Sequence, residues 1–553
     1  MSERQRVEVL VVGAGPVGLT AAHELARRGI AVRLVDAASG PAVTSRAIAT
    51  HARTLETYDA MGVVDDVLAL GQRIEGFTMF NNGSRLVRLD ADYRKNPTAF
   101  PYTLSIDQVR TEAVLRDAVT RQGVTIEWET KLADLTQTGD GVRVSLQHVD
   151  SCAEEPVTVP WVVGCDGGHS TVRKKLELPL VGDSNDTWLL ADTEVTVDLP
   201  RNSIYWIRVG TGTVMLVPLP GENRWRLLDT VDTSDEEDPA AVAERFAGKL
   251  KRGLGRPVTV ELPSWVSVFT AQQRMVPAMR VDRCLVAGDA AHVHSPASGQ
   301  GMNTGIQEAY NLAWKLAMVV RGQADLELLD SYGVERVPIG RALLESTRTA
   351  TRFVALRDAL AGVALPVFFG VVRNFTPLRT KIQNGILGQM SALNVSYVDS
   401  PLSTVDGSVD GAGSGPRPGT RLTSVFGGYP AWPAVAEELR DVRWTLLVLG
   451  EPDLVGGSGL AARLDKELGD RISVRTVVPL PDLGFRPLVD PDGSLATALG
   501  GGPGSWLLVR PDGYLAARGA TLDRSTLHAA LSRAHVRAEQ PPVASDAAVG
   551  AAA

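Results

Sequence analysis

Three glycines that directly follow a short apolar run constrain the fold of this chain more than any other feature of its sequence. Residues 7–12 are almost all apolar, as expected for a strand buried on both faces of a parallel sheet. Gly13, Gly15 and Gly18 then follow at GxGxxG spacing. In that order they allow a tight turn, a close approach of the backbone to a pyrophosphate, and close packing of a helix on the strand.

The residues that follow extend this pattern into a βαβ unit. Residues 19–28 predict a helix, and a helix N-terminus favours a bound phosphate through its unpaired N–H groups and its dipole. A second predicted strand, residues 30–35, ends at Asp36, whose carboxylate can accept hydrogen bonds from a ribose hydroxyl. We therefore predict an α/β fold with a Rossmann-like domain that binds a dinucleotide. The alternative interpretation is a glycine-rich turn in an ordinary α/β protein.

Length and composition exclude several classes of protein. The 553 residues leave room for more than one domain, and a net charge of −8 argues against nucleic acid as a partner. Cys152, Cys165 and Cys284 show neither disulfide nor metal-ligand spacing, so we expect a reducing, cytoplasmic location and no metal. The charged N-terminus predicts no signal peptide. The most apolar stretch, residues 363–372, is too short to span a membrane, so no membrane partner is expected.

Two later clusters repeat the combination of a strand followed by glycine and aspartate. Residues 157–164 predict a strand that ends at Asp166 among glycines, and Ser170 is a suitable cap for the helix after it. A sharper cluster, residues 284–292, places Gly-Asp at 288–289 after another apolar strand. A glycine-rich loop over 296–304 then opens a predicted helix at 305–320, without a basic residue for a phosphate.

These motifs together resemble the class A flavoprotein monooxygenases, the single-component FAD-dependent aromatic hydroxylases. The resemblance covers residues 7–338 and is closest to hydroxylases of phenols and aromatic polyketides that carry a C-terminal thioredoxin-like domain. It implies FAD as cofactor, NADPH or NADH as co-substrate, O2, and hydroxylation of a bulky aromatic small molecule through a flavin C4a-hydroperoxide. Three positions depart from the common pattern. This chain has Asp36 where many members have Glu, Glu308 where many have Asp, and Ser298 where Gly is common.

The resemblance also assigns roles to individual residues. FAD contacts are implied for Gly13, Gly15, Gly18, Asp36, Arg46, Gln108, Asp166, Asp289, Pro296, Gly299, Gly301, Met302 and Asn303. Arg46 and Pro296 are expected to place the flavin for catalysis. The helix N-terminus at 301–304 offers N–H donors to the anionic reduced flavin. No dedicated acid or base is identified, although Arg46 or His51 are candidates to orient or deprotonate the substrate, and His292 and His294 are expected to be structural.

We predict three domains from these patterns. The Rossmann-like FAD-binding domain comprises 1–75, 101–180 and 268–345, and a β-sheet substrate domain comprises 76–100 and 181–267, with strands at 195–199, 203–209, 213–218 and 224–230. Tyr205, Trp206, Met215 and Trp225 are candidates to face a flat aromatic substrate. A helical segment (346–400) and a linker (401–418) lead to a cysteine-free thioredoxin-like α/β domain (419–540) and a disordered tail (541–553). A monomer or homodimer is expected.

Three other functions remain open at this point. A Baeyer–Villiger monooxygenase would insert oxygen beside a ketone, and an FAD reductase or oxidase would insert none. A non-catalytic partner would hold FAD only for stability. The abundance of Arg over Lys and of Ala fits a high-GC genome and makes a substrate from antibiotic or polyketide biosynthesis reasonable.

Overall fold

The computed structural model describes residues 6–90, 97–210, 212–231, 238–294, 299–354, 390–404, 415–425, 432–450 and 459–537, together with positions 93, 375, 377 and 456. The chain forms two compact units: Met1–Tyr310 with Arg336–Val395, and Asn311–Glu335 with Ser396–Ala553. The second unit therefore takes residues 311–335 from the region predicted to belong to the FAD-binding domain. The predictions for Pro296, Ser298, residues 363–372 and the tail at 541–553 lie outside the described residues.

A six-stranded sheet in the first unit gathers the three glycine-rich motifs at the carboxyl ends of its strands. Its order is β19-β20-β12-β1-β2-β8, and all neighbours are parallel except β19 and β20. The strands are β1 (Val9–Val12), β2 (Val32–Val35), β8 (Ile126–Glu127), β12 (Trp161–Gly164), β19 (Arg280–Val281) and β20 (Cys284–Val286). Because Val12 pairs with Gly164, and Gly164 with Val286, the three loops begin side by side. This confirms the predicted Rossmann-like α/β arrangement, in which ligands bind at that end.

Helices and two small sheets complete this layer. The helices are α1 (Pro16–Arg27), α2 (Ala52–Met61), α3 (Val64–Leu70), α4 (Gln108–Arg121), α5 (Thr171–Lys175), η1 (Gly288–Ala290), and the parts of α7 (Gly301–Val320) and α8 (Asp330–Val354) outside residues 311–335. The second unit takes the rest of α7, η3 (Leu326–Leu329) and the start of α8. The small sheets are β11-β10-β9 (Glu154–Val159, Gly141–His148, Thr130–Thr138) and β3-β7-β4 (Ala49–Thr50, Thr103–Ser105, Gln72–Ile74). Pro16 favours the start of α1 because its fixed φ suits the first helical turn, and Gly62 ends α2 with φ +76°.

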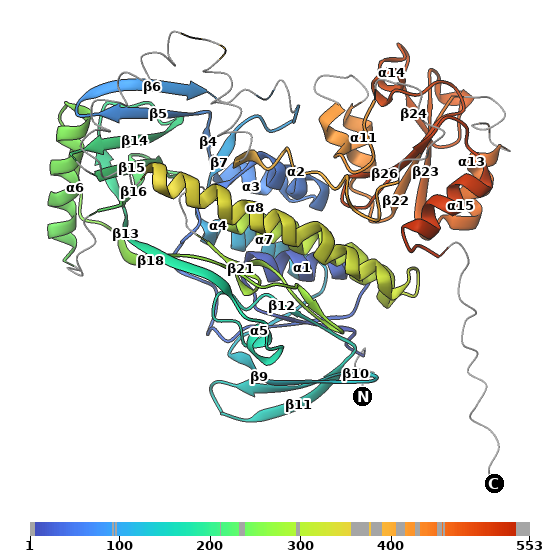
Figure 1. The fold of residues 1–553 in the computed structure, drawn as a ribbon, viewed down its shortest axis with the longest axis horizontal. Coiled ribbons are helices and arrows are strands. Elements are labelled where there is room, and N and C mark those ends of the chain that lie inside the picture. Colours follow the sequence, from blue (N-terminus) through green and yellow to red (C-terminus); the bar gives the residue numbers. More distant parts are fainter. Residues whose placement is uncertain are drawn as a thin grey trace. The chain divides into compact units, whose positions relative to one another are not determined.

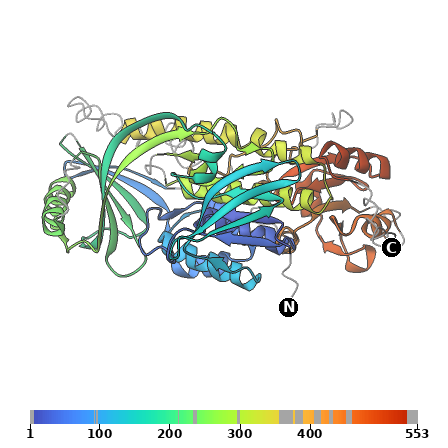
Figure 2. The same cartoon turned by 90° about the horizontal axis from the view of Figure 1, so that it is seen from below.

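A nine-stranded sheet forms the rest of the first unit. Its order is β21-β18-β13-β16-β15-β14-β5-β6, and β17 pairs with β13 outside this path. The strands are β5 (Gly76–Asn81), β6 (Ser84–Asp90), β13 (Val181–Thr196), β14 (Ser203–Val209), β15 (Gly212–Pro218), β16 (Arg224–Asp229), β17 (Thr259–Val260), β18 (Trp265–Met275) and β21 (His292–Val293). The strand predicted at 195–199 was wrong in its bounds. The structure has the long strand β13 there, which begins at Val181 and ends at Thr196. Figure 2 shows β13 and β18 as long curved green strands that continue toward the six-stranded sheet.

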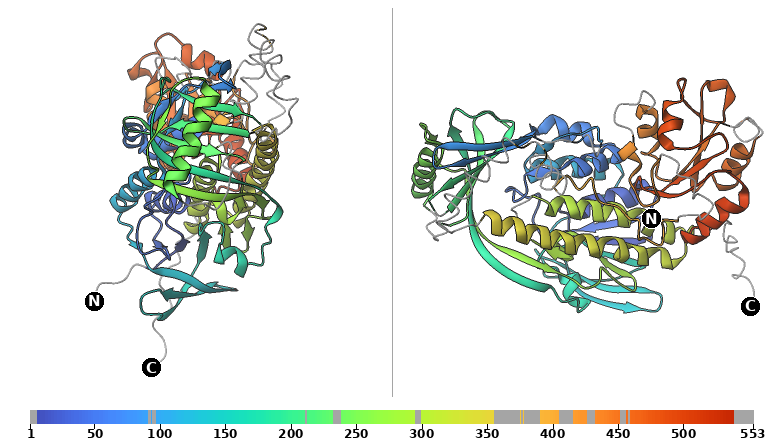
Figure 3. Two further views of the ribbon diagram at one scale, coloured as in Figure 1. Left: turned by 90° about the vertical axis from the view of Figure 1, so that its left-hand side faces the viewer. Right: turned by 45° about the horizontal axis from the view of Figure 1, so that its top comes forward.

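Helix α6 (Pro239–Leu254) covers one face of this sheet, as Figures 1 and 3 show. Phe246, Leu250 and neighbouring α6 side chains form one apolar cluster with Tyr205, Trp225 and other residues of that face. A separate cluster contains Trp188, Met215 and Leu228, with Trp206 and other partly buried residues packed against it. Adjacent strand residues point to opposite faces, so the sheet has one face packed on α6 and a second, aromatic face.

The second unit is built on a five-stranded mixed sheet of order β24-β23-β22-β25-β26. Its elements are η5 (Leu422–Val425), α11 (Trp432–Glu438), β22 (Trp444–Leu449), α13 (Leu460–Leu468), β23 (Ile472–Val478), η6 (Pro481–Leu483), β24 (Pro487–Val489), α14 (Ser494–Leu499), β25 (Trp506–Val509), β26 (Leu515–Gly519) and α15 (Arg524–Arg533). One face packs into a core with Trp314, Met318 and Leu328. The thioredoxin-like interpretation of this unit stays a prediction. None of the described helices is both long and apolar enough to cross a membrane.

Candidate functional site

The glycine loop after β1 requires glycine at two positions for steric reasons. Gly13 has φ +103°, and a Cβ atom there would lie 2.4 Å from the carbonyl oxygen of Cys165. A Cβ atom on Gly18 would lie 1.8 Å from the carbonyl oxygen of Gly13. Gly15 is different, because a Cβ atom there would meet nothing within 4 Å. The protein leaves space beside Gly15, where the sequence predicts the pyrophosphate.

The start of α1 is suited to an anionic ligand. Gly15 caps the helix without a side-chain hydrogen bond, and its first turn carries no acidic residue. The first N–H groups of an α-helix lack intrahelical partners, so they are available to a phosphate. Asp36 lies beside this loop and accepts hydrogen bonds from the N–H groups of Ala14 (2.6 Å) and Ala38 (2.8 Å). The carboxylate predicted to bind the ribose is therefore held in place by the loop itself.

Asp166 caps helix α5 in this structure. Its carboxylate accepts hydrogen bonds from the N–H groups of Thr171 (2.6 Å) and Val172 (3.1 Å) and from Ser170 Oγ (2.5 Å). The predicted capping role of Ser170 is confirmed, because its Oγ accepts from the N–H of Arg173. Asp166 thus shapes the loop with its side chain, and its FAD contact stays a prediction.

Arg173 joins the two loops that contain the Gly-Asp pairs. Its guanidinium donates to the carbonyl oxygens of Gly168 (2.9 Å) and Ala290 (3.2 Å), and the residue is 5% exposed. Asp289 lies beside Ala290 with an exposed side chain that has no hydrogen-bond partner within the described ranges. A free carboxylate at the end of β20 is what the predicted contact with the ribityl chain requires.

The Asp289→Ala variant is expected to purify largely without FAD, with the dissociation constant of FAD raised at least about tenfold. Because the side chain is exposed, the apoprotein should lose less than about 0.5 kcal/mol of stability. The flavin absorbance per protein and the melting temperature of the apoprotein check both parts. Asp117→Ala, an exposed acid on α4, is the matched control. A fully yellow Asp289→Ala protein would contradict the assignment.

The start of α7 is tied to β3 by one side chain. Asn303 is 2% exposed; its Oδ1 accepts from the N–H of His51 (2.8 Å), and its Nδ2 donates to the carbonyl oxygens of Ala49 (2.7 Å) and Gly299 (2.8 Å). Both polar atoms of the Asn303 side chain thus bind backbone groups. Only the backbone N–H of Asn303 is left for the predicted flavin contact. His51 is fully buried and lies 3.1 Å from Thr103 Oγ1, which does not favour a role as substrate base.

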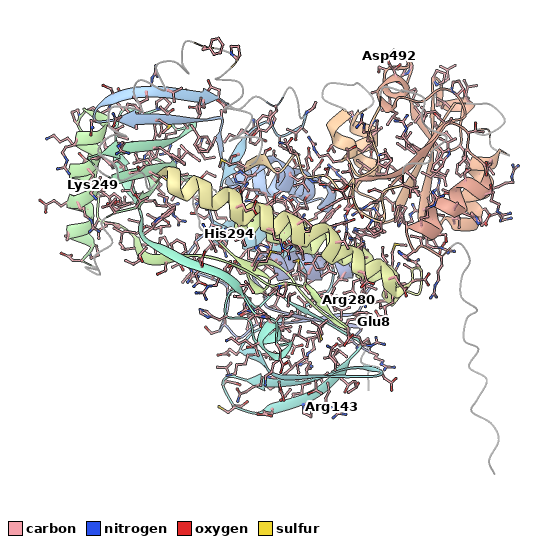
Figure 4. The ribbon with its side chains drawn as sticks, in the orientation of Figure 1. Glu8, Arg143, Lys249, Arg280, His294 and Asp492 are labelled. Carbon is pink, nitrogen blue, oxygen red and sulfur yellow. The ribbon has the colours of Figure 1, made fainter. Side chains whose placement is uncertain are left out.

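The glycines around this helix start lie close to neighbouring side chains, and Gly299 also has a backbone conformation that favours glycine. Gly299 has φ +62°, with the Cβ of Ala49 at 2.9 Å from the position of its own Cβ atom. A Cβ atom on Gly301 would lie 2.6 Å from His294 Cε1. Met302 is 9% exposed and packs at the start of α7. His294 stacks on His292 with ring centroids 5.9 Å apart, and Figure 4 labels His294.

Beneath the second Gly-Asp loop lies a buried ion pair between His292 and Glu308. Glu308 Oε1 is 2.8 Å from His292 Nε2, and Oε2 accepts from the N–H of Gly288 at 2.9 Å. Arg336 is 3.9 Å from the same carboxylate, and all three side chains are essentially unexposed. Glu308 therefore fixes the loop of Gly288 and Asp289 against α7, and His292 has the structural role predicted for it. No group of three or more His, Cys, Asp or Glu side chains in the described ranges is arranged to hold a metal ion.

Raising the pH is expected to weaken the stabilisation by this pair. Burial alone would lower the pKa of His292, but Glu308 and Asp289 outweigh it and raise the pKa above 6.5. Protonated His292 therefore stabilises the folded state fully below pH 6.5, and this contribution is lost as the pH rises through the raised pKa. Burial would also raise the pKa of Glu308, but His292 and Arg336 lower it below 4.5, so the carboxylate stays ionised throughout this range.

The measurement is the melting temperature between about pH 6 and about pH 9, where an unperturbed histidine would already be neutral. The His292→Gln variant, which retains a donor for Glu308, should show a smaller fall over this interval than the wild type. Equal falls in both proteins would show that the pair does not contribute.

Arg46 and Gln108 lie together, as a shared cofactor contact requires. Gln108 Oε1 accepts from the N–H of Ala47 (3.2 Å), and the N–H of Gln108 donates to the carbonyl of Ala47 (3.1 Å). Gln108 Nε2 donates to Glu112 Oε1 at 2.8 Å. The side chain of Arg46 is exposed and forms no ion pair with any described residue. Its guanidinium is thus left for an anionic ligand.

The four candidate substrate residues separate onto the two faces of the nine-stranded sheet. Tyr205 donates to the carbonyl of Pro200 (2.5 Å) and, like Trp225, is buried against α6. These two residues belong to the α6 core, so the structure contradicts a substrate contact for them. Trp206 and Met215 belong to the aromatic face.

The comparisons with known proteins agree with this geometry. Residues 6–347 match the model of the FAD binding domain family. The chain is 50% identical to the 6-methylpretetramide 4-monooxygenase of Streptomyces rimosus, over 98% of this chain and 96% of that protein. The chain belongs to the FAD-dependent aromatic monooxygenases. Its cofactor is FAD, and the geometry of the glycine loop, the start of α1 and the free Asp289 fit that group.

Solved structures of similar proteins extend across nearly the whole chain. The anhydrotetracycline hydroxylase of Streptomyces rimosus superposes with a TM-score of 0.70 at 28% identity, covering 96% of this monooxygenase and 99% of that chain. A Diels-Alderase of pyrroindomycin biosynthesis superposes with a TM-score of 0.65 at 26% identity, covering 95% and 99%. The same fold thus occurs in a protein named for a different reaction, so the reaction must be argued from the site.

Sequence reasoning did not single out several residues that lie beside the candidate site. Arg226 and Asp192 form a buried ion pair beside residues 45–47, called here the Arg46 segment. Trp188 and Trp265 belong to the aromatic face. No local pattern singled out Arg226, because three of the six residues of β16, RWRLLD, are charged. Trp188 lay outside every predicted strand, so no pattern assigned it to a face.

Proposed function

We propose that this monooxygenase hydroxylates a fused polycyclic phenol of the 6-methylpretetramide type, with O2 and NADPH or NADH as co-substrates. The observation that carries the proposal is the aromatic face of the nine-stranded sheet, opposite α6. Around a centre of Trp188, Met215 and Leu228 it gathers Phe77, Trp206, Trp265 and Phe269. A flat, largely apolar ligand is the kind that aromatic and thioether side chains bind. The 50% identity to a 6-methylpretetramide 4-monooxygenase supports the same substrate class. We place the reaction in the cytoplasm, in a monomer or homodimer.

Polar groups on this face, and one farther along β18, suit the oxygens of such a substrate. The indole N–H groups of Trp188 and Trp206 are buried without an acceptor, and Gln273 Oε1 is buried without a donor, within the described part of the chain. Buried polar atoms are normally paired, so unpaired ones indicate a bound molecule or water. Two donors and one acceptor match the carbonyl and hydroxyl groups of a polyphenol. We assign these three side chains to substrate orientation.

The residues of the protein bind the cofactor and the substrate, stabilise negative charge and keep water from the substrate. FAD held by these residues would supply the redox chemistry, namely hydride acceptance from NAD(P)H and activation of O2. The N–H groups at the start of α7 stabilise negative charge near the cofactor through the helix dipole. The aromatic face holds the substrate ring and keeps water from it. Arg46 binds anionic phosphate, and no dedicated acid or base is assigned.

Anaerobic reduction by NADPH and by NADH, with and without 6-methylpretetramide, tests the proposal. We expect reduction to accelerate when this compound is present, followed by incorporation of one atom of isotopically labelled O2 as a ring hydroxyl. Label in a ring-expanded ester would indicate Baeyer–Villiger chemistry instead. Reduction that is fast with or without the compound, and without label in a product, would indicate a reductase or oxidase. No reduction at all would indicate a protein that holds FAD without redox catalysis.

A pair of variants tests the assignment of the two faces. Trp206→Phe removes an indole N–H from the aromatic face and is expected to raise KM for 6-methylpretetramide about tenfold, the cost of one lost hydrogen bond. Tyr205→Phe, its neighbour on the α6 face, removes the hydrogen bond to Pro200 and should leave KM unchanged. Equal KM values in the two variants would contradict the assignment.

A further inference from the structure

Arg226 of β16 forms a two-pronged ion pair within the nine-stranded sheet. Its Nε donates to Asp192 Oδ1 at 2.6 Å and its Nη2 to Asp192 Oδ2 at 2.7 Å. Asp192 lies directly opposite on the neighbouring strand β13, and the two side chains are 3% and 10% exposed. This geometry fixes the guanidinium in one orientation, because a planar fork matches both carboxylate oxygens.

The same guanidinium reaches out of the sheet to two consecutive backbone carbonyls. Nη2 donates to the carbonyl of Ser45 and Nη1 to that of Arg46, both at 2.6 Å. The ring of Trp265, from the aromatic face, lies 4.9 Å below the guanidinium carbon. Arg226 is therefore a direct link between the face assigned to the substrate and the segment assigned to the cofactor.

The Arg46 segment is held at several further points. Ser45 Oγ accepts from the N–H of Val109 at 3.1 Å, and Ala47 exchanges hydrogen bonds with Gln108. These contacts hold the residues on both sides of Arg46, while the side chain of Arg46 itself is exposed. Such an arrangement fixes the position of the Arg46 backbone and leaves its guanidinium for a ligand.

We propose that Arg226, oriented by Asp192, is a positioning residue for FAD. By holding the carbonyls of Ser45 and Arg46, it directs the guanidinium of Arg46 toward the cofactor phosphates. The inference rests on the proposed FAD contact of Arg46. Lysine cannot replace arginine here, because one ammonium group cannot bind a carboxylate at two points and two carbonyls at once.

The sheet provides a matched control on its opposite face. Asp229, three residues along β16, pairs with Lys249 of α6 at 2.6 Å, and its side chain is 1% exposed. Figure 4 labels Lys249 on this helix. Lys249→Met removes an ion pair of the same strand on the face of the sheet that packs on α6, opposite the face of Arg226. This variant measures how much the loss of an ion pair of the sheet alone changes FAD affinity and the melting temperature.

The experiment measures the dissociation constant of FAD and the melting temperature of the apoprotein for Arg226→Lys and Lys249→Met. We expect Arg226→Lys to weaken FAD binding by about tenfold or more, while Lys249→Met stays within about twofold of wild type at a similar loss of melting temperature. An unchanged dissociation constant in Arg226→Lys, or an equal change in both variants, would overturn the proposal.

A double-mutant cycle with Arg46 separates positioning from general damage. If Arg226 acts through Arg46, then Arg226→Lys adds little further loss of FAD affinity in an Arg46→Met background. Fully additive losses would overturn the proposal. If Arg226→Lys does not fold, the double variant Asp192→Leu with Arg226→Met removes both buried charges and gives the same readout. None of these measurements needs NAD(P)H or an aromatic substrate, so a failure of the proposed hydroxylation would be distinguishable.

Discussion

The Arg510→Met variant is expected to lose about 3–5 kcal/mol of stability in the second unit, since it leaves buried charge uncompensated. Arg510 Nη1 and Nη2 donate to Glu335 Oε1 (2.6 Å) and Oε2 (2.9 Å), and Nε and Nη2 donate to Asp512 at 2.9 and 2.5 Å. Lys315 donates to Glu335 Oε2 at 2.7 Å. All four side chains are 0–3% exposed.

This cluster contains two buried acids, Glu335 and Asp512, and two buried bases, Lys315 and Arg510. Burial alone would lower the pKa of Arg510, but Asp512 and Glu335 outweigh it and raise that pKa. Burial lowers the pKa of Lys315 to about 8, although Glu335 opposes the shift. Without Arg510, two buried carboxylates would share the one remaining base, Lys315. Removing one partner of a buried network is far more costly than replacing all of it by apolar groups.

Urea unfolding of the full chain, with hydrogen exchange followed in β22 and β25, measures this loss in the second unit. The matched control is Arg486→Met, which removes a pair with Asp465 in the same unit, where the arginine side chain is 46% exposed. An exposed pair contributes only about 0–1 kcal/mol. The prediction fails if the two variants unfold at the same urea concentration. Adding Asp512→Asn to Arg510→Met restores neutrality and should recover part of the loss.

The second large effect is expected for Gly18→Ala, which should abolish stable FAD binding and destabilise the apoprotein. The new Cβ atom would lie 1.8 Å from the carbonyl oxygen of Gly13, a backbone atom that cannot move without opening the turn. Overpacking of this kind costs about 1–3 kcal/mol or more. Flavin absorbance after purification and the melting temperature of the apoprotein should both fall.

Gly15→Ala is the matched comparison three residues away. Its Cβ atom meets no protein atom within 4 Å, and its φ of −72° suits any residue. The apoprotein should therefore be unchanged or more stable by about 0.4–1 kcal/mol, while FAD binding weakens at least about tenfold. Unimpaired FAD binding in Gly15→Ala would show that the pyrophosphate does not lie beside this glycine.

The motifs at the ends of β1, β12 and β20 were predictable because each depends on residues adjacent in sequence. A strand, a glycine turn and a following helix leave a local pattern, and the parallel order then brings the three loops together. The faces of the nine-stranded sheet were not predictable in the same way. All but the first residue of β15 and of β16 is buried, so the alternation that would distinguish Trp225 from its neighbours is absent.

Long-range contacts explain the other differences. Arg226 lies 34 residues from Asp192 and 180 from Arg46, so only the folded chain reveals their contact. The resemblance implied a flavin contact for Asn303, and the structure shows that its side chain binds the backbone of Ala49 and His51. The boundary of the second unit was missed because helical periodicity continues through α7 without a break at residue 310.

That boundary has a consequence for recombining relatives of this enzyme. Trp314, Met318 and Leu328 share one core with Trp444, although more than a hundred residues of sequence separate them from it. A single crossover after residue 404 would import a foreign sheet while keeping these three side chains from the recipient, and the resulting core would be a hybrid. Exchange of the C-terminal part of the second unit between relatives should therefore succeed when residues Asn311–Glu335 are exchanged together with it. In a library of chimaeras, two-segment exchanges should survive more often than single crossovers.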